Sequence, residues 1–303
     1  MTKFNRRSLL KAAPLGLAAP LPAVSRMSSA VSPASESLDL FFSLKIGMVR
    51  DGANLTEKFT QVQRLGFDGI ELDSPNGYGP DEVAQAKKAT GLPVHGVVDS
   101  AHWQVRLSDP DPNVRAQGVK NLAGAVVHAH AYGGSAVLLV PGTVRGKEET
   151  QRHVWERSIQ GLRQVLPSCA RLGIRILIEN VWNGFCYQHN GPADQGAELL
   201  RDYLDAINSP WVGSYFDIGN HQKYGRPAEW IRTLGPRIVK LDVKDWGTQS
   251  GFCKIGEGDV DWDAVRAALL AIGYTGWATA EVSGGGEERL KDVHRRMVEA
   301  LRA

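Results

Sequence analysis

Short apolar runs alternate with longer amphipathic stretches along the chain from residue 44 to the C-terminus. The apolar runs are hydrophobic at nearly every position, which is typical of parallel strands that are covered on both faces. They predict strands at 44–49, 69–72, 94–98, 136–140, 174–178, 212–216, 238–243 and 278–282. In the stretches between them, apolar residues recur at the three- to four-residue spacing of a helix. These stretches predict helices at 55–64, 80–89, 112–132, 149–172, 193–207, 227–233, 261–272 and 286–301.

Residues at the ends of these stretches agree with the pattern. Gly91 and Gly173 each follow a helical stretch, where a left-handed C-terminal cap favours glycine. Asp111 precedes Pro112, which places an N-cap before a proline at the first helical position. The repeated strand-then-helix unit predicts an α/β protein, specifically a (β/α)₈ TIM barrel. An open doubly wound sheet is the alternative, but no G-x-G-x-x-G follows the first strand to support a dinucleotide-binding version.

The N-terminal segment differs from the rest of the chain. The twin arginine Arg6-Arg7 precedes an Ala-, Pro- and Leu-rich run that is too short and too interrupted by proline to span a bilayer. This pattern predicts a twin-arginine-type signal peptide and linker over residues 1–36, and a barrel domain over 37–303. We therefore expect a periplasmic or otherwise exported protein without a transmembrane span. A disordered basic tail is the alternative.

Charge and cysteine content exclude some classes of protein. The formal net charge is +2, but five basic residues precede Glu36, the first acidic residue, and subtracting them leaves −3. A mildly acidic body offers no basic face, so we expect no nucleic-acid partner. Cys169, Cys186 and Cys253 lack C-x-x-C spacing, which favours free buried thiols, although one disulfide stays open.

Carboxylates recur where the predicted strands end. Glu71 lies near the end of the second strand, and Glu179, Asp217, Asp242 and Glu281 lie in or directly after the fifth to the eighth. In a (β/α)₈ barrel, the C-terminal ends of the strands form the active-site face. Carboxylates that meet there would repel one another, and partial burial would further disfavour their charged form. A divalent cation bound among them offsets both costs. Oxygen ligands favour a hard or borderline ion, so we expect one Mn²⁺ or Mg²⁺ ion.

Other polar and aromatic residues follow the same strand ends. They are His102 and Trp103 after the third strand, Asn220 and His221 after the sixth, and Lys244, Trp246 and Lys254 after the seventh. Aromatic rings beside hydrogen-bonding groups suit a sugar, so we expect these residues, with Glu71, to bind a small-molecule sugar. Four further histidines lie in predicted helices and receive no functional role: His128, His130, His153 and His294.

Six short motifs occur in an order and spacing that are typical of one superfamily. They are GFDGIEL at 66–72, LSDPDP at 107–112, IEN at 178–180, FDIGN at 216–220, VKD at 243–245 and GEGDVDW at 256–262. From about residue 45 onward, the chain resembles the sugar phosphate isomerase/epimerase superfamily with a xylose-isomerase-like barrel. That superfamily includes ketose 3-epimerases, inosose dehydratases and endonuclease IV, so the motifs are not specific for one reaction.

The resemblance implies one metal ion held by Glu, Asp, His and Glu from the last four strands. Glu179, Asp217 and Glu281 match three of these positions, and Asp242 stands where ketose epimerases and inosose dehydratases have histidine. A carboxylate in place of imidazole favours harder cations and adds negative charge. This departure and the acidic body both disfavour the endonuclease IV branch, which uses many histidines and binds phosphate backbones.

A second departure concerns the group that polarises the substrate. Asn220 stands where the family often has histidine, and His221 follows one position later. Two observations disfavour a phosphate on the substrate: phosphorylated sugars are scarce outside the cytoplasm, and the sequence shows no helix-capped phosphate loop of the usual kind. The glycines 284–286 after the last strand are a modest candidate for such a loop.

The leading hypothesis is a metal-dependent sugar isomerase or epimerase that acts on an aldose or ketose through an enediolate. Glu179 and Glu281 would be the acid/base carboxylates on opposite faces of the substrate. One alternative is a lyase or dehydratase that eliminates a β-substituent from a keto-sugar or keto-glycoside, and another is a non-catalytic carbohydrate-binding barrel. The sequence leaves open the sugar, its stereocentre and whether the chain forms a homo-oligomer.

Overall fold

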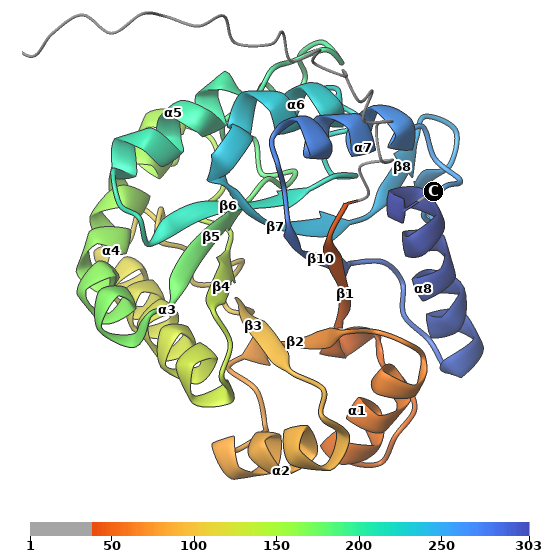
Figure 1. The fold of residues 1–303 in the computed structure, drawn as a ribbon. Coiled ribbons are helices and arrows are strands. Elements are labelled where there is room, and N and C mark those ends of the chain that lie inside the picture. The colour runs from red at the N-terminus through yellow and green to blue at the C-terminus, as the bar shows by residue number, and fades with distance from the viewer. Residues whose placement is uncertain (1–37, 303) are drawn as a thin grey trace, which may run out of the picture. The chain divides into compact units, whose positions relative to one another are not determined.

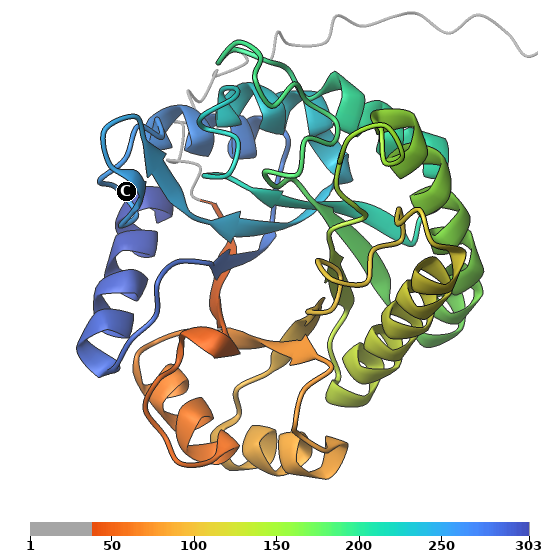
Figure 2. The same ribbon diagram turned by 180° about the vertical axis from the view of Figure 1, so that it is seen from behind.

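The computed structural model describes residues 38–302, which form a closed barrel of parallel strands. Around the barrel the strands follow the order β1-β10-β7-β6-β5-β4-β3-β2, and helices surround them in both views (Figure 1 and Figure 2). This arrangement confirms the predicted (β/α)₈ barrel. The predicted signal peptide and linker, residues 1–36, lie outside the described residues.

The elements alternate along the chain. The barrel strands are β1 (Leu40–Lys45), β2 (Gly69–Ser74), β3 (Val94–Asp99), β4 (Ala136–Leu139), β5 (Arg175–Glu179), β6 (Val212–Asp217), β7 (Ile238–Val243) and β10 (Gly276–Ala280). The helices are α1 (Leu55–Arg64), α2 (Pro80–Thr90), α3 (Pro112–Tyr132), α4 (Gln151–Leu172), α5 (Glu198–Ile207), α6 (Pro227–Leu234), α7 (Trp262–Ala271) and α8 (Glu287–Arg302). The short elements are η1 (Ile46–Met48), η2 (Gly235–Arg237) and the hairpin strands β8 (Asp245–Gly247) and β9 (Gly251–Cys253).

The first strand differs from its prediction. It was expected at 44–49 but runs from Leu40 to Lys45, and the 3-10 turn η1 follows it directly. Buried hydrophobic residues continue from the strand into η1, so hydrophobicity alone does not define where the strand ends. Pairing on both sides decides the boundary, because the last pairs are Leu44 with Ala280 of β10 and Lys45 with Glu71 of β2. The strand therefore ends at Lys45, at the rim of the barrel.

Polar side chains from several strands meet inside the barrel. Ser43, His95, Tyr215 and Thr279 come from four strands and form a buried hydrogen-bonded chain, with contacts of 2.7–2.9 Å between neighbours. Lys240 donates to His95 Nδ1 at 2.9 Å, and burial lowers the pKa of Lys240 to about 8. Successive strand residues point to opposite faces. The residue two positions further toward the C-terminal end of a strand therefore also points into the barrel.

Three further expectations can be compared with the described residues. All three cysteines are free, which confirms the preference for free thiols, although Cys253 is only half-buried. His128, His130, His153 and His294 lie in helices, as expected. No helix between residues 38 and 302 has the length and hydrophobicity needed to cross a bilayer.

Candidate metal centre

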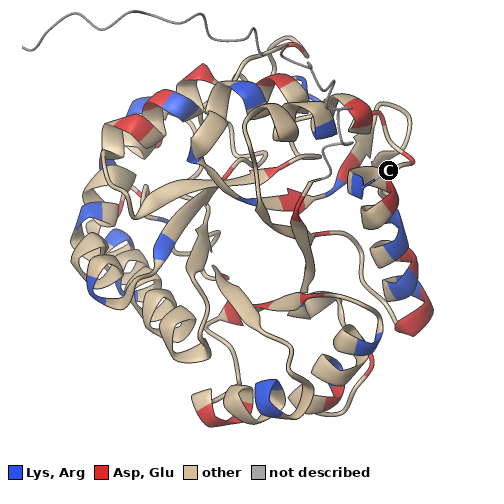
Figure 3. Cartoon of the chain, viewed as in Figure 1, with Lys and Arg blue, Asp and Glu red and all other residues tan. Residues whose placement is uncertain are grey.

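Four predicted carboxylates meet at the C-terminal ends of the barrel strands. Glu179 and Asp217 end β5 and β6, Asp242 lies in β7, and Glu281 directly follows β10. The interior strands thus carry acidic residues as well as the outer helices do (Figure 3). One oxygen from each of the four carboxylates lies within 4.8 Å of the others, and Asp217 and Asp242 are fully buried. We call these four residues the carboxylate cluster.

Two lysines contact the carboxylate cluster. Lys45 Nζ lies 3.0 Å from Asp242 Oδ2 and 3.1 Å from Glu281 Oε1. Lys244 Nζ lies 2.6 Å from Glu281 Oε2 and 3.1 Å from Asp217 Oδ2. Burial lowers the pKa of each lysine, but the surrounding carboxylates outweigh burial and raise it above the usual value. Both lysines are therefore charged.

Burial opposes ionisation of most of the carboxylate cluster. Desolvation raises the pKa of Glu179 and Asp242 well above the usual range, and the charge of Glu281 adds to both shifts. Desolvation also raises the pKa of Asp217, to about 6. Burial likewise raises the pKa of Glu281, but Lys45 and Lys244 outweigh it and hold that pKa below its usual range. Keeping all four groups ionised requires further positive charge.

The residues present fit a divalent cation. The carboxylate cluster carries a charge of −4 when ionised and the two lysines carry +2, which leaves −2 for one divalent ion to neutralise. Asp242 Oδ1 and Asp217 Oδ2 are buried without a hydrogen bond, although Asp217 Oδ2 is in ion-pair contact with Lys244. A buried carboxylate oxygen without a hydrogen bond is costly, and coordination would satisfy both. An all-oxygen ligand set suits Mg²⁺ or Mn²⁺.

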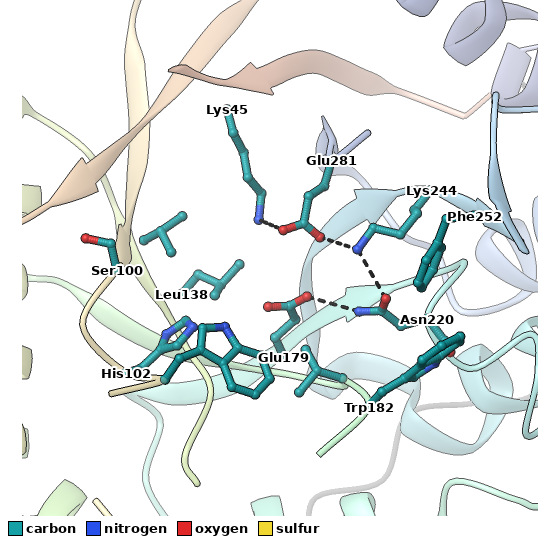
Figure 4. A pocket seen from close by; sticks show the side chains of 13 residues that line it. Lys45, Ser100, His102, Leu138, Glu179, Trp182, Asn220, Lys244, Phe252 and Glu281 are labelled. Carbon is teal, nitrogen blue, oxygen red and sulfur yellow. Dashed lines mark hydrogen bonds and ion pairs between the residues drawn. The ribbon is translucent and has the colours of Figure 1, made fainter. Parts of the chain in front are cut away.

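A cavity of about 380 Å³ opens onto this centre (Figure 4). Its polar wall consists of Lys45, Ser100, His102, Glu179, Asn220, Lys244 and Glu281. Its apolar wall consists of Val98, Trp103, Leu138, Val181, Trp182 and Phe252. The rings of Trp182 and Phe252 are 4.8 Å apart, and Trp103 and Phe252 are 39% and 49% exposed. Exposed aromatic faces beside hydrogen-bonding groups suit a sugar. We call this space the reaction cavity.

Asn220 connects two groups of the polar wall, Glu179 and Lys244. Its Nδ2 donates to Glu179 Oε1 at 3.2 Å, and its Oδ1 accepts from Lys244 Nζ at 3.1 Å. Its backbone N–H donates to Asp217 Oδ1 at 2.6 Å, which anchors the residue directly after β6. Asn220 therefore orients Glu179, and Lys244 orients Glu281 (Figure 4).

The predicted sugar-binding residues divide into two groups. His102, Trp103, Asn220 and Lys244 line the reaction cavity. Burial lowers the pKa of His102 to about 3, so its ring is neutral, and His102 Nδ1 accepts a hydrogen bond from the backbone of Val140.

The other four predicted residues lie away from the reaction cavity. His221 is buried, with its ring 4.5 Å from that of Trp230 and its Nδ1 3.2 Å from the side-chain nitrogen of Asn180. Glu71 is buried inside the barrel, where it accepts from the Tyr215 hydroxyl at 3.2 Å. Trp246 does not line the cavity and packs 6.4 Å from Trp182, and Lys254 lines a separate, adjoining cavity.

Lys45, Trp182 and Phe252 were missed by sequence reasoning. Lys45 was hidden because the first strand was predicted too far along the chain, and the correct strand places it at the rim. Trp182 follows Glu179 by three residues in the loop after β5, and this proximity to a predicted ligand was the available signal. Phe252 lies in the β8–β9 hairpin, between the VKD and GEGDVDW motifs but outside both.

Asp245 organises the loop that carries Phe252. Its buried carboxylate accepts from the backbone N–H groups of Gly256 at 2.8 Å and Gly258 at 3.2 Å, and from Trp262 Nε1 at 3.2 Å. A Cβ at Gly258 would lie 2.2 Å from Asp245 Oδ1, so only glycine permits this close approach. Asp245 thereby fixes the position of the hairpin at the edge of the reaction cavity.

Known proteins are similar to this chain in sequence. A family model described as xylose isomerase-like TIM barrel matches residues 59–303. The curated L-ribulose-5-phosphate 3-epimerase UlaE of Escherichia coli K12 is 27% identical over 267 residues, which cover 80% of this chain and 90% of that protein.

Solved structures share the fold at lower identity. The 3-keto-D-glucoside 4-epimerase YcjR from E. coli superposes with a TM-score of 0.71 at 18% identity, over 87% of this chain and 99% of that one. An IolI protein with a bound zinc atom superposes with a TM-score of 0.72 at 16% identity, over 86% and 98%. At these identities the similarity establishes the barrel fold.

Proposed function

Because the chain belongs to the xylose isomerase-like TIM barrel family, we propose that it is a metal-dependent sugar epimerase or isomerase. The observation that carries this proposal is the pair Glu179, at the end of β5, and Glu281, directly after β10, which both line the reaction cavity (Figure 4). Asp217 and Asp242 complete the carboxylate cluster between them in strand order. The similarity to a curated ketose-phosphate 3-epimerase supports the same reaction type.

The proposed cofactor is one Mn²⁺ or Mg²⁺ ion bound by Glu179, Asp217, Asp242 and Glu281. When bound, it supplies Lewis acidity that polarises a sugar carbonyl and acidifies the neighbouring C–H group. An IolI protein of the same fold binds zinc, but the ligand set of this chain contains only oxygen, which favours a harder ion.

Glu179 and Glu281 perform the proton transfers. Epimerisation removes a proton from one face of a carbon and returns a proton to the other, so it needs two acid/base groups. Asn220 holds Glu179 Oε1, and Lys244 holds Glu281 Oε2, which aims both carboxylates into the cavity. The ammonium groups of Lys45 and Lys244 also stabilise negative charge that develops on the substrate oxygens.

The remaining cavity residues bind and orient the sugar. Trp103, Trp182 and Phe252 offer ring faces for the C–H groups of the substrate. The neutral ring of His102 and the Ser100 hydroxyl provide hydrogen bonds on the wall opposite the β8–β9 hairpin side chain of Phe252 (Figure 4). The four carboxylates favour a catalytic centre over a site that only binds sugar, because sugar binding alone does not require them.

A proton-exchange experiment tests this proposal. Manganese-loaded protein is incubated in D₂O with L-ribulose, D-tagatose, L-ribulose 5-phosphate and a 3-keto-glucoside, and the products are analysed by NMR and mass spectrometry. We expect an epimer or isomer with deuterium at a carbon next to the carbonyl, loss of activity with EDTA, and recovery with Mn²⁺. Glu179→Gln and Glu281→Gln should abolish exchange, whereas Glu148→Gln, at an exposed position outside the cavity, should not. A product of lower mass would indicate elimination, and exchange that persists without metal would contradict the proposal.

We also propose that the protein is exported by the twin-arginine route. Arg6-Arg7 and the apolar run that follows support this location, and they lie outside the described residues. The route exports folded proteins, so a metal ion can be loaded in the cytoplasm before export. This order matters for an oxygen-rich site, because Cu²⁺ and Zn²⁺ otherwise outcompete Mn²⁺ and Mg²⁺.

A further inference from the structure

A second cavity, of about 520 Å³, adjoins the reaction cavity. The two spaces are contiguous, because Lys244, Phe252 and Glu281 line both. The second cavity is bounded further by Cys253, Lys254, Val282, Ser283 and Arg289. A substrate in the reaction cavity can therefore extend past the Phe252 ring into this second space, which we call the side cavity.

The side cavity carries excess positive charge. Lys254 is exposed and makes no ion pair with any residue between 38 and 302. Arg289 is held in place because its Nε donates to the Ser283 carbonyl at 3.0 Å and its Nη1 to Asp292 at 3.1 Å. The charge of Asp292 is shared with two more arginines of α8, Arg295 and Arg296. Glu281, the acidic residue of the side cavity, is already paired with two lysines.

The glycine-rich turn before α8 does not provide an alternative anion site. The backbone N–H of Glu287 already donates to Asp51 Oδ2 at 3.1 Å, and a Cβ at Gly286 would lie 2.8 Å from that oxygen. A Cβ at Gly284 would lie 2.1 Å from the Met48 carbonyl, so this glycine allows the turn to pack on η1. An anion at the start of α8 would meet the Asp51 carboxylate, which leaves Lys254 and Arg289 as the available cationic groups.

We propose that the side cavity binds an anionic group, a phosphate ester or a carboxylate, at the far end of the sugar. The inference rests on the proposed function and narrows its substrate class to ketoses or keto-sugars that carry this charge. A guanidinium already held on one side presents its remaining N–H groups to two oxygens of either anion, and Lys254 adds a point charge. Lys254 therefore acts at the distal end of the substrate, away from the reacting carbons.

Two pairs of sugars test this inference, each with the same ketose type with and without terminal charge. The pairs are L-ribulose with L-ribulose 5-phosphate, and D-tagatose with D-tagaturonate. Their Kd values are measured by calorimetry on the metal-loaded full chain. We expect at least one charged member to bind about tenfold more tightly than its neutral partner, as for one charge-assisted hydrogen bond. Lys254→Met and Arg289→Met should each remove most of that advantage and leave the neutral sugar unchanged.

Controls separate charge recognition from structural damage. Lys291→Met removes an exposed lysine from the same helix as Arg289 and should change no Kd. Arg289→Lys keeps the charge and should retain part of the advantage, and the exposed Lys254→Met variant remains informative if Arg289→Met unfolds. An advantage for the phosphate alone assigns a phosphate subsite, and an advantage for tagaturonate alone assigns a carboxylate subsite.

Two results would overturn the inference. One is equal affinity for the charged and neutral members of both pairs. The other is an equal loss of affinity for the charged and the neutral member of a pair in Lys254→Met. Failure of the proposed function is a separate result, since it appears as absence of metal-dependent proton exchange with all four sugars, whichever binds more tightly.

Discussion

Replacement of Lys45 by methionine tests whether this lysine balances the charge of the metal centre. Lys45 bridges Asp242 and Glu281 at 3.0 and 3.1 Å, and its side chain is 13% exposed whereas Asp242 is fully buried. Removing one partner of a buried ion pair costs up to about 3–5 kcal/mol, and protonation of Asp242, whose pKa is raised by burial, relieves part of this cost. Metal-free Lys45→Met should therefore unfold at a lower urea concentration than wild type. Its free energy of unfolding should be lower by up to that amount.

The same substitution should strengthen metal binding. It changes the charge of the carboxylate cluster with its lysines from −2 to −3, because one of the two ammonium groups is lost. Removing a cation that repels the ion should lower the Kd for Mn²⁺ at least about tenfold, equivalent to about 1.4 kcal/mol. Metal should therefore stabilise Lys45→Met more than wild type, because a ligand that binds only the folded state stabilises it in proportion to its affinity.

Calorimetric titration of chelator-treated protein with Mn²⁺ measures this effect, and urea unfolding with and without the ion measures the linked stability. The matched variant is Lys45→Met/Asp242→His, which restores the net charge of −2 with a neutral ligand and should bind Mn²⁺ with an affinity closer to wild type. Lys291→Met serves as an exposed control. Unchanged or weaker Mn²⁺ binding in Lys45→Met would refute the charge-balance argument.

Four further predictions follow from the site and the N-terminal segment. Glu179→Gln should lose bound metal and nearly all turnover with an unchanged circular dichroism spectrum, as elemental analysis and activity assays would show. Asp242→His should retain metal but prefer Co²⁺ or Zn²⁺ in competition assays, and unchanged selectivity would place Asp242 outside the ligand set. Asp245→Ala should lower stability by about 3 kcal/mol and raise the KM for sugar, because the hairpin that carries Phe252 loses its buried acceptor. Arg6→Lys/Arg7→Lys should leave active protein in the cytoplasm, and recovery of uncleaved wild type only from the cytoplasm would contradict export.

Local patterns were sufficient for most helices and for the carboxylates. Helix α3 begins at Pro112 after its Asp111 cap, and α2 ends before Gly91, which adopts a left-handed conformation, as the residue types predict. Glu179 and Asp217 were recognised because each ends an apolar strand, and barrel strands deliver such residues to one face. These features depend on neighbours within a few positions, so they can be read from the chain alone.

Lys45 and Phe252 show where local pattern was insufficient. Apolar residues run through both β1 and η1, and the strand ends at Lys45 because that residue makes the last pair with β2. Phe252 reaches the reaction cavity because the Asp245 carboxylate accepts hydrogen bonds from backbone N–H groups of the loop that follows the hairpin. Both placements arise from contacts that form only when distant segments are folded together.

The sequence by itself determined the barrel and the carboxylates at the ends of its last four strands. Only the tertiary structure decided that Lys45 is paired with Asp242, 197 positions away, and that Lys254 and Arg289 share a cavity beside the reaction cavity. The physical reason is that strand and helix periodicity is a local property of the chain. Charge compensation and cavity shape instead depend on barrel closure, which brings β1 and β10 together and makes their neighbours common walls of one site.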